Sequence, residues 1–366
     1  MLPLLGLADK RVPDKRLHVL DGVRGWGALA VVLFHLFVEG FPIGEWSRTH
    51  LWRVPLFHGT FAVLVFFLVS GVALSTGYFM TGAARELARL AAGRYLRLAL
   101  PVAGACLLVF ALMKLGLIPR WQERPPPFDA MLRFDPSLRH LAYFVSWGVF
   151  FDYSYQATFI GPLWTMPIEL TGSFVVFAVL ALAGRSRHRV AVFGALGIAL
   201  FAIGSVYCLF VAGLIAADLY VRSGTTPRPT LGLALMLAGV TLSALGDAPA
   251  TIAHRPMLAS VALLAGILMF EPAQKFFSNP VSRWLGRMSF PLYLMHGPVL
   301  FAFSLPLLAA LRRAGLDEAW ARPLTAGVTL PVAFLASYVL LPANGLATRL
   351  ARQFARTLIP SPSPDA

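Results

Sequence analysis

The sequence predicts an all-α membrane protein, a polytopic transmembrane helical bundle of about ten spans. Of the 366 residues, 58% are hydrophobic and only 13% are charged, which is about half the charged fraction of an average soluble protein. Apolar segments long enough to approach the width of a bilayer recur along the whole chain. Because the bilayer core offers no water to backbone groups, segments of this length are expected to be helices.

The expected helices follow from the apolar segments in order. Several have only 16–17 residues, which is the lower limit for crossing a bilayer. The ten segments lie near 19–38, 59–79, 97–117, 162–183, 189–204, 206–221, 229–245, 256–271, 288–308 and 321–342. An eleventh candidate, 139–152, is short and flanked by polar residues.

The basic residues predict the orientation of the bundle. The net charge of +14 is explained by basic loops facing the cytoplasm, so we expect no nucleic-acid partner. The excess of Lys and Arg on one side is clearest when both termini are cytoplasmic and 139–152 does not cross the membrane. That segment is then expected to lie on or dip into the membrane, within a long external loop at 118–161.

This loop contains the run Pro125-Pro126-Pro127 and many aromatic residues. Long loops of this kind often gate or bind ligands, and an interfacial aromatic belt is an equally good interpretation. The expected organisation is a cytoplasmic N-terminal segment at 1–18, a membrane domain at 19–345 and a cytoplasmic basic tail at 346–366.

The first apolar segment carries a polar stripe made of Asp21, Arg24 and His35. Arg24 and His35 are eleven residues apart, close to three helical turns, so they share one face. A charge in a membrane helix costs at least a few kcal/mol, so it normally faces a protein-lined cavity and has a function. An arginine and a titratable imidazole on one stripe therefore indicate chemistry, with Asp21 expected to fix the Arg24 guanidinium.

Glu169 in the fourth segment is predicted to lie at a similar depth to His35. If the helix runs inward from the outside, Glu169 lies about 10 Å below the outer face. A carboxylate beside an imidazole would orient it and suit it to act as a general base. The alternative is a structural polar contact between helices, which is also the role expected for Trp164 and Ser70.

Arginines gather near the predicted cytoplasmic mouth of the bundle. Arg94 and Arg97 lie at the mouth of the third segment, Arg24 should lie at a comparable height, and Arg287 precedes the ninth. Several arginines around one opening could bind a phosphorylated molecule. The alternative for Arg94 is ordinary anchoring at the membrane surface.

The ninth segment adds one more polar face. Ser289, Tyr293 and His296 are spaced i, i+4, i+7, so they lie together and are expected to contribute to the binding of the same ligand. We expect His296 about 12 Å from the cytoplasmic side, where it would line the same cavity as His35 but would be a poor partner for direct proton transfer. No metal-binding spacing is present in the sequence.

Five motifs in order resemble the acyltransferase 3 family of integral membrane acyltransferases. They are Arg24 to His35 within LDGVRGWGALAVVLFH, then FFLVSG at 66–71, RYLRLALP at 94–101, PLWTMPIE at 162–169 and LGRMSFPLYLMHGP at 285–298. The fourth motif departs from the family in having a single acidic residue, and the fifth lacks the aromatics that usually flank its histidine.

The resemblance implies an acyl-CoA-dependent enzyme of the bacterial inner membrane. Together with the residues above, it predicts transfer of an acyl group, taken to be acetyl, from cytoplasmic acyl-CoA to a hydroxyl of an extracytoplasmic or lipid-linked carbohydrate. His35 would be the general base, assisted by Glu169 and Arg24, and a covalent acyl-histidine relay stays open. The alternatives are a secondary transporter and a scaffold for envelope assembly, and a homodimer is one expected form.

Overall fold

The computed structural model describes residues 15–120, 123–223, 228–245 and 252–360, and all regular structure within these ranges is helical. This confirms the predicted all-α class. The α-helices are α1 Lys15–Phe34, α2 Gly44–His50, α3 Gly59–Thr81, α4 Ala84–Lys114, α5 Leu138–Tyr143, α6 Val149–Phe151, α7 Thr165–Ala183, α8 Arg189–Ala202, α9 Tyr207–Ser223, α10 Pro229–Ala244, α11 His254–Met269, α12 Glu271–Phe277, α13 Pro280–Val299, α14 Leu305–Arg313 and α15 Glu318–Leu358.

Seven short 3₁₀ or π segments of the described residues join or extend these helices. They are η1 His35–Gly40, η2 Leu51–Arg53, η3 Pro55–Phe57, η4 Pro126–Phe128, η5 Phe144–Gly148, η6 Gly161–Trp164 and η7 Leu300–Ser304. Three of them lengthen a membrane helix without interrupting it, because η1 continues α1, η6 leads into α7 and η7 joins α13 to α14.

Helices occupy all ten predicted segments, but they differ in their capacity to cross a membrane. Within the described residues, six helices are long and apolar enough to do so: His18–Gly40, Gly59–Thr81, Ala84–Lys114, Gly161–Ala183, Pro280–Arg313 and Glu318–Leu358. The pair α11 and α12, bent by 97°, would make a seventh span. The structure therefore supports six to seven spans, and the count of ten and the cytoplasmic termini stay predictions.

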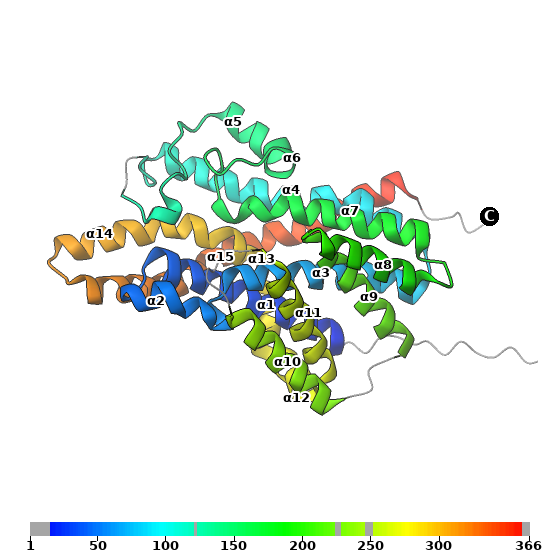
Figure 1. The fold of residues 1–366 in the computed structure, drawn as a ribbon. Coiled ribbons are helices and arrows are strands. Elements are labelled where there is room, and N and C mark those ends of the chain that lie inside the picture. The colour runs from blue at the N-terminus through cyan, green and yellow to red at the C-terminus, as the bar shows by residue number, and fades with distance from the viewer. Residues whose placement is uncertain (1–14, 121–122, 224–227, 246–251, 361–366) are drawn as a thin grey trace, which may run out of the picture.

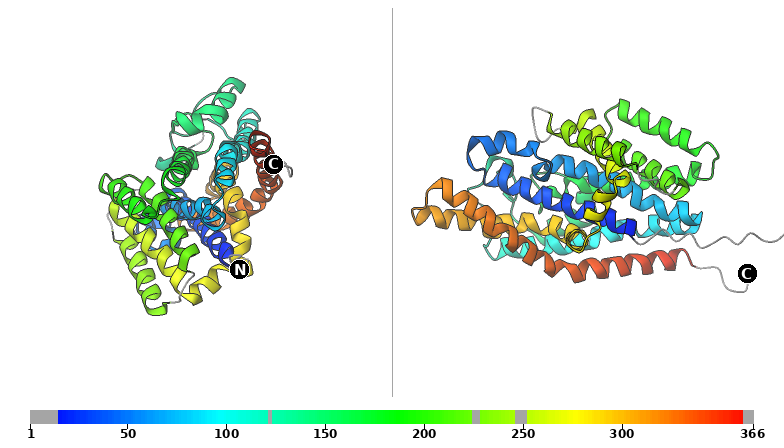
Figure 2. Two further views of the ribbon diagram at one scale, coloured as in Figure 1. Left: turned by 90° about the vertical axis from the view of Figure 1, so that its right-hand side faces the viewer. Right: turned by 90° about the horizontal axis from the view of Figure 1, so that it is seen from below.

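The long helices run nearly parallel to one another along one axis of the molecule, as the second view in Figure 2 shows. At the centre, α1 packs against both α13 and α3, while α15 packs along α4 and α13. The helices α10 and α11 pair with each other and lie obliquely below the long helices in Figure 1. This arrangement places α1, the helix with the polar stripe, inside the bundle.

The contact between α1 and α13 is close because glycines face each other there. A Cβ on Gly25 would lie 2.4 Å from the Gly286 nitrogen, and one on Gly286 would lie 2.5 Å from the Asp21 carbonyl oxygen. The two helices run in the same direction, since Gly25 meets Gly286 and His35 meets His296 further along. Small residues thus set both the spacing and the register of this pair.

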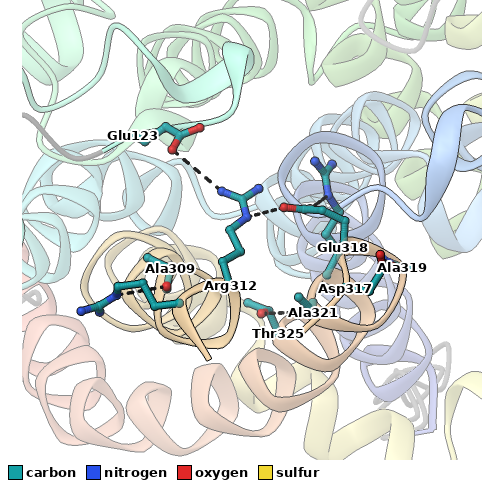
Figure 3. A network of polar contacts seen from close by, with 10 residues as sticks. Glu123, Ala309, Arg312, Asp317, Glu318, Ala319, Ala321 and Thr325 are labelled. Atoms are coloured by element: carbon teal, nitrogen blue, oxygen red, sulfur yellow. Dashed lines mark hydrogen bonds and ion pairs between the residues drawn. The ribbon is translucent and has the colours of Figure 1, made fainter. Parts of the chain in front are cut away.

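The described residues of the segment 118–161 cover one side of the bundle, above α4 and α7 in Figure 1. Its helical part, Leu138–Phe151, is not among the helices of the described chain that could span a membrane. Figure 3 shows how the segment is tied to the turn between α14 and α15: Glu123 lies 3.9 Å from Arg312, which also pairs with Glu318.

The last helix extends further than the sequence analysis expected. α15 contains 41 residues and continues through Thr348 and Arg352 to Leu358 without a break. The boundary predicted between 345 and 346 therefore falls inside a helix. The predicted terminal segments at 1–18 and 346–366 lie partly outside the described residues, at 1–14 and 361–366.

We predict that Gly25→Ala destabilises the bundle, because the added methyl group would collide with the backbone of α13. The expected loss is about 1–3 kcal/mol, as for other overpacked interiors, and thermal unfolding in detergent would measure it. Gly77→Ala in α3 is the control, because a Cβ there meets no atom within 4 Å. Equal stability of the two variants would contradict the close contact at Gly25.

Candidate active site

Two histidines from different helices meet near the ends of α1 and α13. His35 Nδ1 lies 3.1 Å from His296 Nε2, and the two rings are stacked with their centroids 5.0 Å apart. The prediction that His296 would be a poor partner for His35 was wrong. It took the ninth helix to begin near residue 288, whereas α13 begins at Pro280, so His296 lies about 24 Å along its helix rather than 12 Å.

The hydrogen bonds of His296 indicate which nitrogen of His35 is free to act as a base. The His296 Nδ1 lies 2.9 Å from the Leu292 carbonyl oxygen, which can only accept. A neutral His296 therefore carries its proton on Nδ1 and accepts on Nε2. The His35 Nδ1–H then donates to His296, and His35 Nε2 is left without a proton.

The carboxylate beside His35 belongs to Glu39, not to Glu169. His35 Nε2 lies 3.5 Å from Glu39 Oε2, and both side chains are about one-fifth to one-quarter exposed. Sequence analysis missed Glu39, although its i, i+4 spacing from His35 was a signal for it. Both residues lie in η1, the π-helical turn that ends the first membrane helix.

Glu169 instead forms the centre of a polar cluster between α3, α4 and α7. Its Oε1 accepts a hydrogen bond of 2.7 Å from Ser70 and forms an ion pair with Arg94. Arg94 in turn donates to Ser173 Oγ over 2.7 Å. The prediction that Glu169 orients His35 is therefore wrong, because its carboxylate already matches the charge of a buried arginine.

Arg94 is one of several arginines that converge on this end of the bundle. Arg24 and Arg97 lie close enough to repel it electrostatically, and Arg352 from α15 lies close to Arg97. Arg97 also donates to Thr348 Oγ1 over 2.9 Å. Sequence analysis missed Arg352 and Thr348, because it placed both in the cytoplasmic tail.

The charge of this arginine cluster is only partly matched. Glu169 pairs with Arg94, whereas the half-buried Arg24 has no ion-pair or hydrogen-bond partner within the described ranges. Asp21, expected to fix Arg24, is exposed and forms no ion pair with it. Closely spaced arginines with unmatched charge are suited to bind phosphate groups.

The other residues predicted to bind the ligand, Tyr293, Ser289 and Arg287, differ in their surroundings. Tyr293 links α13 to the start of α7, since its hydroxyl donates to the Pro162 carbonyl over 2.5 Å and lies 2.8 Å from Thr165 Oγ1. Ser289 is turned back on its own helix and donates to the Gly286 carbonyl. Arg287 is exposed and lies outside these polar contacts.

A cavity of about 130 Å³ opens beside the two histidines. His35, His296 and Glu39 form its polar wall, and Phe128, Tyr155 and Trp164 contribute aromatic rings from other elements. Phe128 and Tyr155 belong to the segment 118–161, for which ligand binding or gating and an interfacial aromatic belt were equally good interpretations. Trp164, which was predicted to be a structural polar residue, also lines the cavity.

Comparison with known proteins shows which family the chain belongs to. Residues 17–341 match the family described as an acyltransferase domain. The chain belongs to the acyltransferase 3 family. It is also similar to the O-acetyltransferase PaAT-1 of Phomopsis amygdali, with 25% identity over 364 residues that cover 77% of this chain and 71% of PaAT-1. No solved structure matches the chain.

The protein is thus a membrane acyltransferase, as the sequence motifs predicted, and its family implies an acyl-CoA donor. The arginine cluster fits such a donor, because CoA carries phosphates and Arg24 is an unmatched, half-buried cation. Among the described residues, no group of three or more His, Cys, Asp or Glu could hold a metal ion.

We predict that Glu169→Gln destabilises the acyltransferase, because it leaves the buried Arg94 guanidinium uncompensated. Removing one partner of a buried ion pair typically costs about 3–5 kcal/mol, which thermal unfolding would detect. The double variant Arg94→Gln/Glu169→Gln should recover part of this loss. The control is Glu45→Gln, which removes one partner of the exposed pair with Arg48 and should change stability by less than about 1 kcal/mol. If Glu169→Gln is as stable as this control, the cluster does not depend on the ion pair.

Proposed function

We propose that this acyltransferase moves an acetyl group from cytoplasmic acetyl-CoA to a hydroxyl of an extracytoplasmic or lipid-linked carbohydrate, with His35 as the general base. The observation that carries this proposal is the His35–His296 pair in the wall of a cavity. His35 belongs to the same membrane helix as Arg24, the unmatched arginine of the cluster. The family match favours this function over a secondary transporter.

The donor is proposed to bind through its phosphates at Arg24, Arg94, Arg97 and Arg352. Arg24 and His35 lie eleven residues apart in one helix, or roughly 16 Å. The extended pantetheine arm of CoA is suited to cover such a distance along the bundle. Tyr293 and the polar face of α13 lie on the way to the histidines and would line this path.

The acceptor is proposed to enter the cavity beside His35. Its aromatic walls suit a sugar ring, because rings such as Phe128, Tyr155 and Trp164 can stack against the apolar face of a carbohydrate. Burial and, less strongly, the nearby Glu39 raise the pKa of Tyr155 to about 12, so its hydroxyl stays protonated at neutral pH. That hydroxyl donates to the Pro127 carbonyl, which fixes the ring in the wall.

His35 performs the proton transfer in this mechanism. Its free Nε2 takes the proton from the acceptor hydroxyl while the hydroxyl oxygen attacks the thioester carbonyl. As the carbon–sulfur bond breaks, the same nitrogen returns the proton to the departing thiolate, so the ring ends as it began. His296 keeps the His35 proton on Nδ1 and thereby keeps Nε2 available.

We predict that purified protein in detergent consumes radiolabelled acetyl-CoA and that His35→Ala abolishes this turnover while acetyl-CoA still binds. Arg97→Ala should instead raise the Kd for acetyl-CoA about tenfold, since one charge-assisted contact is lost. Arg349→Ala is the matched control, because Arg349 is an exposed arginine of α15 next to Thr348. Wild-type turnover by His35→Ala would refute the mechanism, and equal effects of Arg97→Ala and Arg349→Ala would refute the donor site.

The proposed topology has ten spans, cytoplasmic termini and an external 118–161 segment, in a bacterial inner membrane. The distribution of basic residues and the family resemblance support it. The exposed apolar faces of the helices are expected to contact membrane lipid. A homodimer that covers part of these faces is also compatible with them.

This topology predicts that a cysteine at Arg185→Cys in intact cells is protected from an impermeant thiol reagent, whereas one at Asp135→Cys is labelled. The two native cysteines, Cys106 and Cys208, are buried, so the background should be low. Labelling of Arg185→Cys from the outside, with Asp135→Cys protected, would invert the proposed orientation.

A further inference from the structure

Glu39 is held beside His35 by an unusual turn of the chain. The first membrane helix changes to π-helical geometry over His35–Gly40, and the Phe41 N–H donates to the Leu36 carbonyl five residues earlier over 2.7 Å. Gly40 is required in this turn, because a Cβ there would lie 2.7 Å from the His35 carbonyl oxygen. π-helical turns of this kind are frequent at functional sites.

Glu39 has no other charge to match. Within the described part of the chain, the one basic side chain within ion-pair distance of Glu39 is His35, which carries a charge only when its ring is protonated. Tyr155 lies nearby, but its hydroxyl donates to the Pro127 carbonyl. By contrast, Glu169 is paired with Arg94. Glu39 is therefore the carboxylate in this region whose charge is still available to a positive group in the cavity.

We propose that Glu39 is the charge partner of His35 and stabilises the imidazolium that forms when Nε2 accepts the proton of the acceptor hydroxyl. This inference rests on the proposed function of His35 as the base. At 3.5 Å the two side chains are further apart than a hydrogen bond, so Glu39 does not block Nε2 in the resting site. Glu39 is a positioning residue, because it acts on the reaction through His35.

The physical reason is that the interaction differs between the two states of the ring. A neutral imidazole gains little from a carboxylate at this distance, whereas an imidazolium forms an ion pair with it in a poorly solvated site. Interactions that are stronger in the transition state than in the ground state are the ones that raise kcat. The proton moves from the acceptor oxygen to Nε2 and then to the CoA thiolate, so Glu39 gains and loses no proton.

The experiment measures the reactivity of His35 with diethyl pyrocarbonate, which ethoxycarbonylates unprotonated imidazole nitrogens and creates positive charge on the ring as it reacts. The rate at residue 35 would be followed by peptide mass spectrometry in wild type, Glu39→Gln and Glu39→Asp. We expect the rate in Glu39→Gln to fall about tenfold, one order of magnitude for one lost charge contact. Glu39→Asp should restore part of it, because the charge is kept.

Two controls separate this effect from a general change of structure. Glu45→Gln removes an acid from α2 that pairs with Arg48, and it should leave the reactivity of His35 unchanged. His254 is exposed and lies on α11, so its reaction rate should be equal in every variant. Thermal unfolding and acetyl-CoA binding should also be unchanged in Glu39→Gln, while kcat falls about 100-fold, a typical contribution of proton-transfer catalysis.

The proposal is overturned if His35 of folded Glu39→Gln reacts within twofold of wild type, even when the wild type transfers acetyl groups. It is also overturned if His35 of the wild type does not react while His254 does, because Nε2 would then not be a free base. If the wild type consumes no acetyl-CoA but Glu39→Gln still lowers the reactivity of His35, the proposed function fails and the pairing of Glu39 with His35 stands.

Discussion

The close parallel contact between α1 and α13 is the constraint on which the site depends. Gly25 and Gly286 bring the two backbones together, and each histidine lies ten residues further along its own helix, about 15 Å. Two helices that run in the same direction from a common contact keep the same height. His35 and His296 therefore meet because of a contact three turns away, where neither histidine takes part.

The same pair of helices separates two electrostatic environments. At the end near Arg24, cations outnumber the one acid that matches them, and the site attracts an anion. At the end near His35, two neutral rings can form a chain of hydrogen bonds that finishes at the Leu292 carbonyl. In the proposed function, a negatively charged donor would thus bind at a place distinct from the one where the proton moves.

The sequence predicted the helical class and the parts of the site that lie within one helix. The spacing of Arg24 and His35, and that of Tyr293 and His296, could be converted into shared faces because a helix has a fixed geometry. Contacts between helices could not be obtained in this way. The depth of His296 depended on where α13 begins, and an error of eight residues in that start moved it by about 12 Å.

Other residues were missed because they lay outside the expected elements. Arg352 and Thr348 were assigned to a tail, since composition alone does not show that α15 continues past its apolar part. Glu39 was not predicted because Glu169 was expected to be the acid of the site, and both glutamates lie in the expected outer half of the bundle. Depth estimates cannot distinguish two such residues, whereas the partner of each side chain can.

The two glutamates illustrate how a membrane protein distributes its few acids. Glu169 offsets a buried arginine, so its charge is matched before any ligand arrives, and its removal is expected to affect folding. Glu39 has no cation beside it in the resting site, which is unfavourable for a carboxylate in a poorly solvated place. In the proposed mechanism, that cost is relieved when His35 becomes positive. An acid that is poorly matched at rest and well matched during proton transfer favours catalysis over stability.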